Sequence, residues 1–300
     1  MKRVRQRTRF LFYLLVMESL QHIFNDCGLN VQRADSVHGG DINDCYCLFT
    51  STGKYFLKVN DKKKYPLMFE KEANGLELLL KNSTLIIPQV IKTGAYDDKQ
   101  YLLLEWLEKA SPHKDMWEQF GQSLAMMHKH PQQYFGLSED NYIGSLQQIN
   151  GKYTHWHTFY AECRILPLIK SLFDSGAYSS KDVKTAEALC AKLEQLFPIE
   201  PPSLLHGDLW AGNYFVHSSG YATIFDPAAY YGHREMDLGM TKLFGGFDQR
   251  LYNAYDHHYR LEPDWQKRLP LTQLYPILVH AVLFGGHYVS SALNLIRALA

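Results

Sequence analysis

Apolar positions follow short runs in the first third of the chain and a helical period after it. Over residues 117–128 they recur every three or four positions, as in an α-helix with one buried face. The earlier runs are short and bounded by turn residues, which is typical of β-strands. We predict a strand-rich N-lobe over residues 17–107 and a helical C-lobe over residues 108–300. One predicted strand leads into a glycine turn that begins after residue 37. Further predicted strands cover residues 46–49, 55–59, 85–90 and 101–106.

Helical spacing also occurs outside the 117–128 segment. An amphipathic helix is predicted over residues 68–79 of the N-lobe, and a turn that contains Gly94 is predicted between the last two N-lobe strands. A compact apolar run over residues 222–225 predicts a buried strand inside the C-lobe. Further predicted helices cover residues 156–168, 181–196, 252–259 and 274–288.

The first 16 residues combine a basic head with an apolar run, as a signal peptide does. However, the run is short and no small-residue cleavage site follows it. It is also too short to span a membrane. Our hypothesis is that Met17 is the biological start, or that residues 1–16 form a poorly packed extension.

Composition restricts the class of protein. Of 300 residues, 46% are hydrophobic and 21% are charged, and the formal net charge is zero. This balance suits a globular enzyme and argues against a nucleic-acid or membrane partner, since both need a basic face. The five cysteines are odd in number and lack a C-x-x-C pair, which favours a reducing, cytoplasmic location. The oligomeric state is not indicated.

Candidate chemistry lies in the sequence HGDLWAGN and in the strand that follows it. Asp208 and Asn213 stand five positions apart in a loop, and Asp226 follows the strand predicted over residues 222–225. Each pair alone is compatible with ordinary turn chemistry. The order D-x4-N, strand, D is more specific, because phosphoryl transfer needs a carboxylate near the attacking hydroxyl and oxygen ligands for Mg²⁺.

These segments resemble the fructosamine (ketosamine) kinase family. The resemblance rests on HGDLWAGN and on DPAAYYGHREMDLGMTKLFGGF, and it continues through most of residues 17–288. It implies an α+β, two-lobed, protein-kinase-like fold of the aminoglycoside-phosphotransferase branch. In that fold the N-lobe is small and mostly an antiparallel sheet with one helix, and the C-lobe is larger and helical.

The resemblance also implies how ATP and Mg²⁺ are bound. Asp208 would be the catalytic carboxylate, while Asn213 and Asp226 would hold Mg²⁺. Lys58 would grip the nucleotide phosphates, aimed by a helix glutamate. Glu72 matches the family position for that partner, with Glu70 as the competitor. Nucleotide-binding positions also include the glycine loop and a hinge, at Gly39, Gly40, Glu105, Trp106 and Leu107.

Several other positions carry two interpretations. Asp140, Asn141 and Arg164 could contact substrate or could be structural. Asp237 could cap a helix or, as in the resembling fold, brace the catalytic loop. Candidate sugar-site residues are Tyr230, Tyr231, His233, Arg234 and Glu235.

The implied function is ATP-dependent phosphorylation of a ketosamine, such as fructosamine or ribulosamine, at the sugar 3-hydroxyl during deglycation. The substrate would be free or attached to a protein lysine. The alternative is a kinase for another hydroxylated small molecule, aminoglycoside-like or choline-like. A non-catalytic nucleotide-binding module is a weaker alternative, because Lys58, Asp208, Asn213 and Asp226 are all present.

Overall fold

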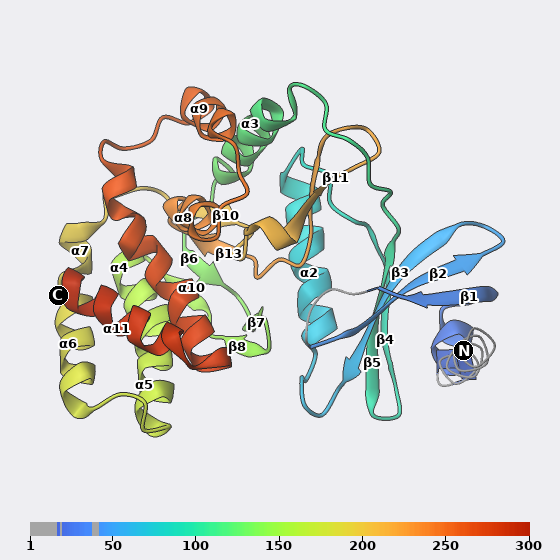
Figure 1. The fold of residues 1–300 in the computed structure, drawn as a ribbon, viewed down its shortest axis with the longest axis horizontal. Coiled ribbons are helices and arrows are strands. Elements are labelled where there is room, and N and C mark those ends of the chain that lie inside the picture. The colour runs from blue at the N-terminus through green and yellow to red at the C-terminus, as the bar shows by residue number, and fades with distance from the viewer. Residues whose placement is uncertain (1–16, 19, 38–41) are drawn as a thin grey trace, which may run out of the picture. The chain divides into compact units, whose positions relative to one another are not determined.

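The computed structural model describes residues 17, 18, 20–37 and 42–300 (Figure 1). The hypotheses about residues 1–16, Gly39 and Gly40 therefore fall outside the described residues. Contacts divide the chain into two units. The strand-rich unit contains the described residues up to Asn74 together with Pro88–Glu108, and the helical unit contains Gly75–Ile87 and Lys109–Ala300. The predicted lobe bounds stay a prediction.

The strand-rich unit is built on one five-stranded antiparallel sheet with the order β1-β2-β3-β5-β4 (Figure 1). Successive side chains of a strand point to opposite faces. On β3, Leu57 and Val59 pack in the core with Phe24 of the N-terminal helical segment, so Lys58 between them points to the other face. The strands are β1 (Val31–Ser36), β2 (Asp44–Thr50), β3 (Lys54–Asp61), β4 (Val90–Tyr96) and β5 (Lys99–Glu105).

Two local predictions in this region are wrong. Residues 85–89 are not a strand; Ile86 alone makes an isolated bridge, and β4 begins only at Val90. Gly94 is not in a turn either, since it lies inside β4 opposite Tyr101. A Cβ atom at Gly94 would come within 2.5 Å of the Tyr101 hydroxyl. The glycine is therefore explained by close packing of a ring rather than by turn geometry.

Helix α2 (Met68–Asn82) confirms the predicted amphipathic helix and extends it by about one turn. Its apolar positions Phe69, Ala73 and Leu76 are buried, at the three- and four-residue spacing that puts them on one face. Glu70 lies on the exposed side of the same helix.

The helical unit carries most of the helices and several short strands. Its main core gathers around aromatic residues such as Trp156, Phe159 and Tyr160. Its helices are α3 (Met116–His128), α4 (Trp156–Phe159), α5 (Leu166–Asp174), α6 (Ser180–Cys190), α7 (Leu193–Leu196), α8 (Glu235–Leu243), α9 (Gln249–His258), α10 (Leu269–Phe284) and α11 (His287–Leu299), with a π-helix at Tyr160–Ile165 and 3₁₀ turns at Ala211–Asn213 and Trp265–Arg268. Its strands are β6 (Phe135–Leu137), β7 (Asn141–Ile143), β8 (Leu146–Gln148), β9 (Gly151–Tyr153), β10 (Ser203–Leu205), β11 (Tyr214–Val216), β12 (Ala222–Ile224) and β13 (Tyr230–Gly232).

The helix predicted over residues 274–288 is two helices. Gly285 and Gly286 separate α10 from α11, with φ angles of +63° and +59°. Residues with a Cβ atom rarely adopt positive φ angles, whereas glycine adopts them readily. The chain therefore turns sharply between α10 and α11, which lie next to each other in Figure 1.

Among the described residues, no helix has the length and apolar character needed to cross a bilayer. Even α10, an apolar helix of 16 residues, is only about 24 Å long at 1.5 Å per residue. The hydrocarbon core of a bilayer is roughly 30 Å thick.

Candidate active site

The loop after β10 brings Asp208 and Asn213 together. Asn213 ends the 3₁₀ turn Ala211–Asn213, which folds the chain back toward Asp208. The side-chain nitrogen of Asn213 donates to the Asp208 backbone carbonyl at 2.9 Å and to its Oδ2 at 3.0 Å. With its nitrogen engaged in this way, the carboxamide retains its oxygen as the group that can bind a cation.

Asp226 belongs to the same neighbourhood. Strands β11 and β12 pair antiparallel, and the backbone N–H of Phe225 donates to the carbonyl of Asn213 at 3.1 Å. Asp226 is the next residue and has a φ angle of +56°. Such a conformation is uncommon outside glycine and often marks a functional position. The three residues predicted for catalysis and metal binding are thus linked within one unit.

The Asp208 carboxyl has an unusual proton affinity. Burial raises its pKa to about 7, the Asn213 hydrogen bond opposes that rise, and the nearby Asp226 and Asp237 carboxylates add to it. Repulsion between neighbouring carboxylates favours protonation of one of them. A cation placed among these oxygens would remove that repulsion.

Asp237 braces the catalytic loop from helix α8. Its Oδ2 accepts the backbone N–H of His206 at 2.8 Å, and its Oδ1 accepts that of Gly207 at 2.9 Å. Nε2 of His128 lies 3.2 Å from Oδ2. Asp237 is not the helix cap, since Arg234 occupies that position. Of its two interpretations, the brace is the one that the structure supports.

His206 was missed in the sequence, although it begins the HGD motif. Its side chain is fully buried, and Nε2 lies 3.0 Å from the carbonyl oxygen of Phe225 while Nδ1 accepts the backbone N–H of Asp208. Burial lowers the pKa of His206. This neutral imidazole joins the Asp208 loop to the segment that carries Asp226.

The strand-rich unit holds the second group of predicted residues. Nζ of Lys58 on β3 lies 2.7 Å from Oε1 of Glu72 on α2. The two side chains are only 4% and 11% exposed, so solvent screens the pair weakly. Glu70, the competing candidate, is exposed. The ion pair fixes the direction of the lysine head group.

The predicted hinge follows β5. Glu105 is the last residue of that strand, and its N–H donates to the carbonyl of Gln89 at 3.1 Å. The Trp106 ring packs against Phe56, with centroids 6.3 Å apart. Residues 105–107 are all partly exposed, and Leu107 lies beyond the end of the sheet.

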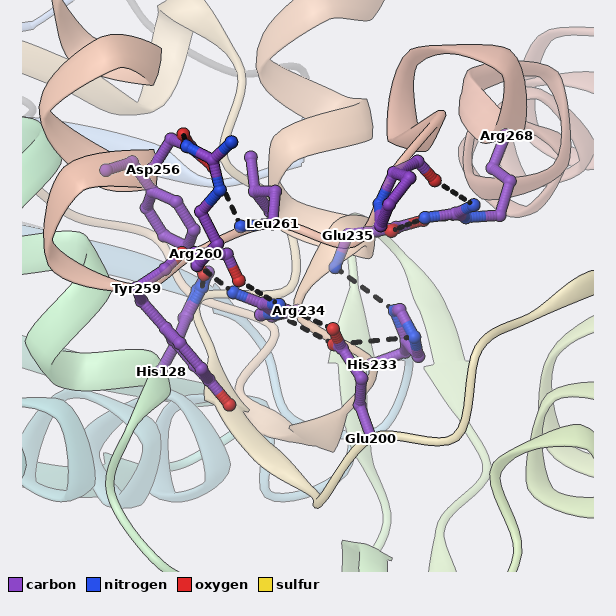
Figure 2. Close-up of polar contacts among 12 residues, drawn as sticks. His128, Glu200, His233, Arg234, Glu235, Asp256, Tyr259, Arg260, Leu261 and Arg268 are labelled. Carbon is purple, nitrogen blue, oxygen red and sulfur yellow. Dashed lines mark hydrogen bonds and ion pairs between the residues drawn. The ribbon is translucent and has the colours of Figure 1, made fainter.

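Three candidate sugar-site residues are instead buried in a polar network (Figure 2). The guanidinium of Arg234 binds both oxygens of Glu200. Nε2 of His233 lies 3.5 Å from Oε2 of Glu200. Glu235 pairs with Arg268 through both of its oxygens. The sugar-site interpretation is wrong for these three residues, because their side chains are at most 2% exposed and the charged groups of Arg234 and Glu235 already bind protein partners.

The other residues with two interpretations also have hydrogen-bond partners within the chain. Asn141 donates to the carbonyl of Ala229 at 2.9 Å, and Oδ1 of Asp140 accepts the N–H of Asn150 at 2.7 Å. Arg164 is fully buried, and its guanidinium carbon lies 4.2 Å from the centre of the Tyr230 ring. It donates to the side-chain oxygen of Asn150 at 2.8 Å.

An antiparallel sheet with a buried lysine–glutamate pair, and a helical unit with linked Asp208, Asn213 and Asp226, define a phosphotransferase of the protein-kinase-like class. The sequence profile described as fructosamine kinase matches residues 16–300. The chain therefore belongs to the fructosamine kinase family, which confirms the resemblance seen in the sequence.

Individual relatives agree with this assignment. A probable ketoamine kinase of Synechocystis is 38% identical over 271 residues, which covers 89% of this chain and 90% of that protein. The chloroplastic protein-ribulosamine 3-kinase of Arabidopsis thaliana is 35% identical over 272 residues, covering 89% and 82%.

Solved structures show the same fold. A protein assigned as a fructosamine-3-kinase from Thermobifida fusca has a TM-score of 0.81 at 35% identity, covering 91% of this chain and 95% of that one. Aminoglycoside phosphotransferase APH(4)-Ia has a TM-score of 0.63 at 13% identity, covering 95% and 99%. At that identity the likeness concerns the fold alone, and it confirms the predicted α+β, kinase-like class.

Proposed function

We propose that this protein transfers the terminal phosphoryl group of ATP to the sugar 3-hydroxyl of a ketosamine, as a step of deglycation. Family membership and the names of the relatives support the reaction class and the substrate class. The observation that carries the proposal is the bond from the Asn213 amide to the Asp208 carboxylate, one hydrogen bond away from the Asp226 segment.

Asp208 is the proposed catalytic carboxylate. It orients the acceptor hydroxyl and takes its proton as the new oxygen–phosphorus bond forms and the bond to ADP breaks. Burial raises the pKa of this carboxyl, which makes it a stronger base than an ordinary aspartate. The Asp237 brace and neutral His206 hold the loop backbone, so the carboxylate keeps its position through the reaction.

Asn213 and Asp226 are the proposed Mg²⁺ ligands. The fit is chemical: the Asn213 carboxamide oxygen and the Asp226 carboxylate are hard oxygen donors, which Mg²⁺ prefers. The Asn213 nitrogen faces Asp208, so the amide has a defined orientation. When bound, Mg²⁺ supplies positive charge to the nucleotide phosphates.

Lys58 is the proposed phosphate contact in the strand-rich unit, aimed by Glu72. A lysine acts on phosphate as a point charge, and the 2.7 Å ion pair keeps that charge in one place. Gly39 and Gly40, outside the described residues, are proposed to cover the phosphates. The backbone at Glu105, Trp106 and Leu107 is proposed to meet adenine.

We also infer a reducing compartment such as the cytoplasm. All five cysteines are free thiols, which suits such a compartment. Free ketosamines and ketosamines on protein lysines are both within the proposed substrate class.

The test is Mg²⁺-ATP consumption by the full chain with a panel of ketosamines, free sugars and aminoglycosides. The proposal predicts turnover of fructosamine or ribulosamine adducts well above that of the parent sugars. Turnover of aminoglycosides with none on any ketosamine would leave a kinase but overturn the substrate class.

A further inference from the structure

A continuous series of ring contacts leaves the loop that carries Asp208. Trp210 is two residues after Asp208, and its backbone N–H donates to the backbone carbonyl of Asp208 at 3.1 Å. The Trp210 ring meets Phe244 with centroids 6.1 Å apart. Phe244 in turn lies 5.3 Å from the His280 ring. The series therefore begins on the loop that carries the proposed catalytic residue, two positions after it.

Helices α10 and α11 continue the series. The His280 ring lies 5.5 Å from Phe284 and 4.9 Å from Tyr288. The Gly285–Gly286 turn, with both φ angles positive, allows the end of α10 and the start of α11 to share this contact. We refer to these five rings as the aromatic series: Trp210, Phe244, His280, Phe284 and Tyr288.

Exposure distinguishes the aromatic series from core packing. Trp210, Phe244 and Phe284 are 39%, 43% and 61% exposed. Single exposed apolar side chains are ordinary, but a contiguous exposed group commonly marks a binding site. The rings come from the catalytic loop, the end of α8, α10 and α11, so four separate segments contribute to the aromatic series.

The central ring has a fixed orientation. Nδ1 of His280 lies 2.7 Å from the carbonyl oxygen of Pro276. The carbonyl can only accept, so Nδ1 carries a proton and donates. The imidazole ring is therefore held between Phe244 and Tyr288. Its orientation is set by the protein before any ligand binds.

We propose that the aromatic series is the subsite for the amine side of the ketosamine, which means its cationic secondary amine and the substituent on that amine. This inference rests on the proposed function. In a ketosamine the amine is attached to the first sugar carbon, close to the hydroxyl on the third. Because Trp210 follows Asp208 by two residues, we place the amine at Trp210 when that hydroxyl is at Asp208, with its substituent directed along the series toward Phe284.

The chemistry of the rings fits this occupant. Aromatic faces attract a cation through their quadrupole, and they bury apolar substituents with a stacking contribution. Neither contact depends on the detailed structure of the substituent. The subsite therefore selects adducts with an extended apolar or aromatic amine substituent over those with a minimal one.

The experiment uses fructose adducts that differ only in the amine: methylamine, Nα-blocked lysine and benzylamine. For each adduct kcat/KM is measured with wild-type protein, with Phe284→Ala, and with Phe173→Ala. Phe173 is the matched control, since it is a 44% exposed phenylalanine on α5 and is not part of the aromatic series. Sedimentation and thermal unfolding of each variant are recorded.

Wild-type protein is expected to prefer the benzylamine adduct to the methylamine adduct. Phe284→Ala is expected to reduce that preference about fivefold, with Phe173→Ala retaining it. If Phe284→Ala lowers kcat/KM equally for both adducts, or not at all, the inference is overturned. Turnover by the wild-type protein would in that case still support the proposed function. A wild-type dimer that Phe284→Ala dissociates would assign the surface to a second copy and also overturn it. No turnover with any adduct would refute both the proposed function and the inference.

Discussion

The side-chain nitrogen of Asn213 donates to both the backbone carbonyl and the carboxylate of Asp208, at 2.9 and 3.0 Å. One carboxamide thus fixes the loop and orients the acid within it. The same residue accepts a hydrogen bond from Phe225, next to Asp226. The proposed catalytic and metal-binding functions are consequently joined through Asn213, and changes in one should affect the other.

Asp226 should control the Mg²⁺ dependence of nucleotide binding. In Asp226→Ala the proposed metal loses its charged ligand, so the affinity for ATP measured by calorimetry should be the same with Mg²⁺ as with a chelator. Wild-type protein should bind ATP at least tenfold more tightly when Mg²⁺ is present. The control is Asp174→Asn, which alters an exposed carboxylate of a surface pair. A full Mg²⁺ response in Asp226→Ala would refute its assignment as a ligand.

Glu72 should matter for ATP and Glu70 should not. Glu72→Gln removes the charge that aims Lys58 across a 2.7 Å contact. Hydrogen bonds to charged groups contribute about 1.5–3 kcal/mol, so kcat/KM for ATP should fall by roughly tenfold or more. Glu70→Gln changes an exposed carboxylate on the same helix and should alter that value by less than about twofold. Equal effects of the two substitutions would contradict the assignment.

Glu200 should be important for stability rather than for catalysis. Its side chain is 6% exposed and pairs with buried Arg234. Glu200→Gln leaves that guanidinium without its counter-charge, which should lower the free energy of unfolding by about 3 kcal/mol. Asp174→Asn breaks an exposed pair with Lys170 and should cost less than about 0.5 kcal/mol. Urea unfolding of both variants measures the contrast, and equal costs would contradict it.

Acid should destabilise the helical unit through groups whose pKa values are lowered by folding. Burial lowers the pKa of His206 and of His233. Burial alone would raise the pKa of Glu200, but its Arg234 hydrogen bonds and neighbouring cations outweigh that effect and lower it. Each group binds a proton more readily once unfolded, so its stabilisation is present above the unfolded pKa and is lost as pH falls.

The histidines set the upper end of this window, near the ordinary histidine pKa of 6.5. Glu200 adds to the loss below the ordinary glutamate pKa of 4.5. The free energy of unfolding in urea should be nearly constant above about pH 7.5. Below it, the two histidines should each lower it by up to about 1.4 kcal/mol per pH unit, offset in part by Asp208, whose pKa of about 7 makes it stabilise the fold as pH falls. His233→Gln should show a shallower decline. Constant stability between about pH 7.5 and about pH 5.5 would contradict the account.

Local patterns predicted much of the site. Asp208 and Asn213 are five positions apart in one loop, and Glu72 is preferred to Glu70 because it matches the family position for the partner of Lys58. Contacts between distant segments could not be predicted in this way. Gly94 suggested a turn. Its actual role is to leave space for the Tyr101 ring, which comes from the next strand and which local sequence does not reveal.

The polar residues after Asp226 show the same limit. His233, Arg234 and Glu235 were candidates for a sugar site, but their side chains are buried. The partner of Arg234 is 34 positions away, and that of Glu235 is 33 away. No local spacing indicates such pairs, and they account for the burial of the Arg234 and Glu235 charges.

The most direct test of the central claim is the turnover of a fructosamine substrate by Asp208→Asn. The substitution preserves the size of the side chain and removes the carboxylate that takes the hydroxyl proton, so kcat should fall by about 10³-fold while calorimetry still detects Mg²⁺-ATP binding. Asp174→Asn, again as the control, should keep wild-type turnover. Phosphorylated product formed by Asp208→Asn at the wild-type rate would contradict the account.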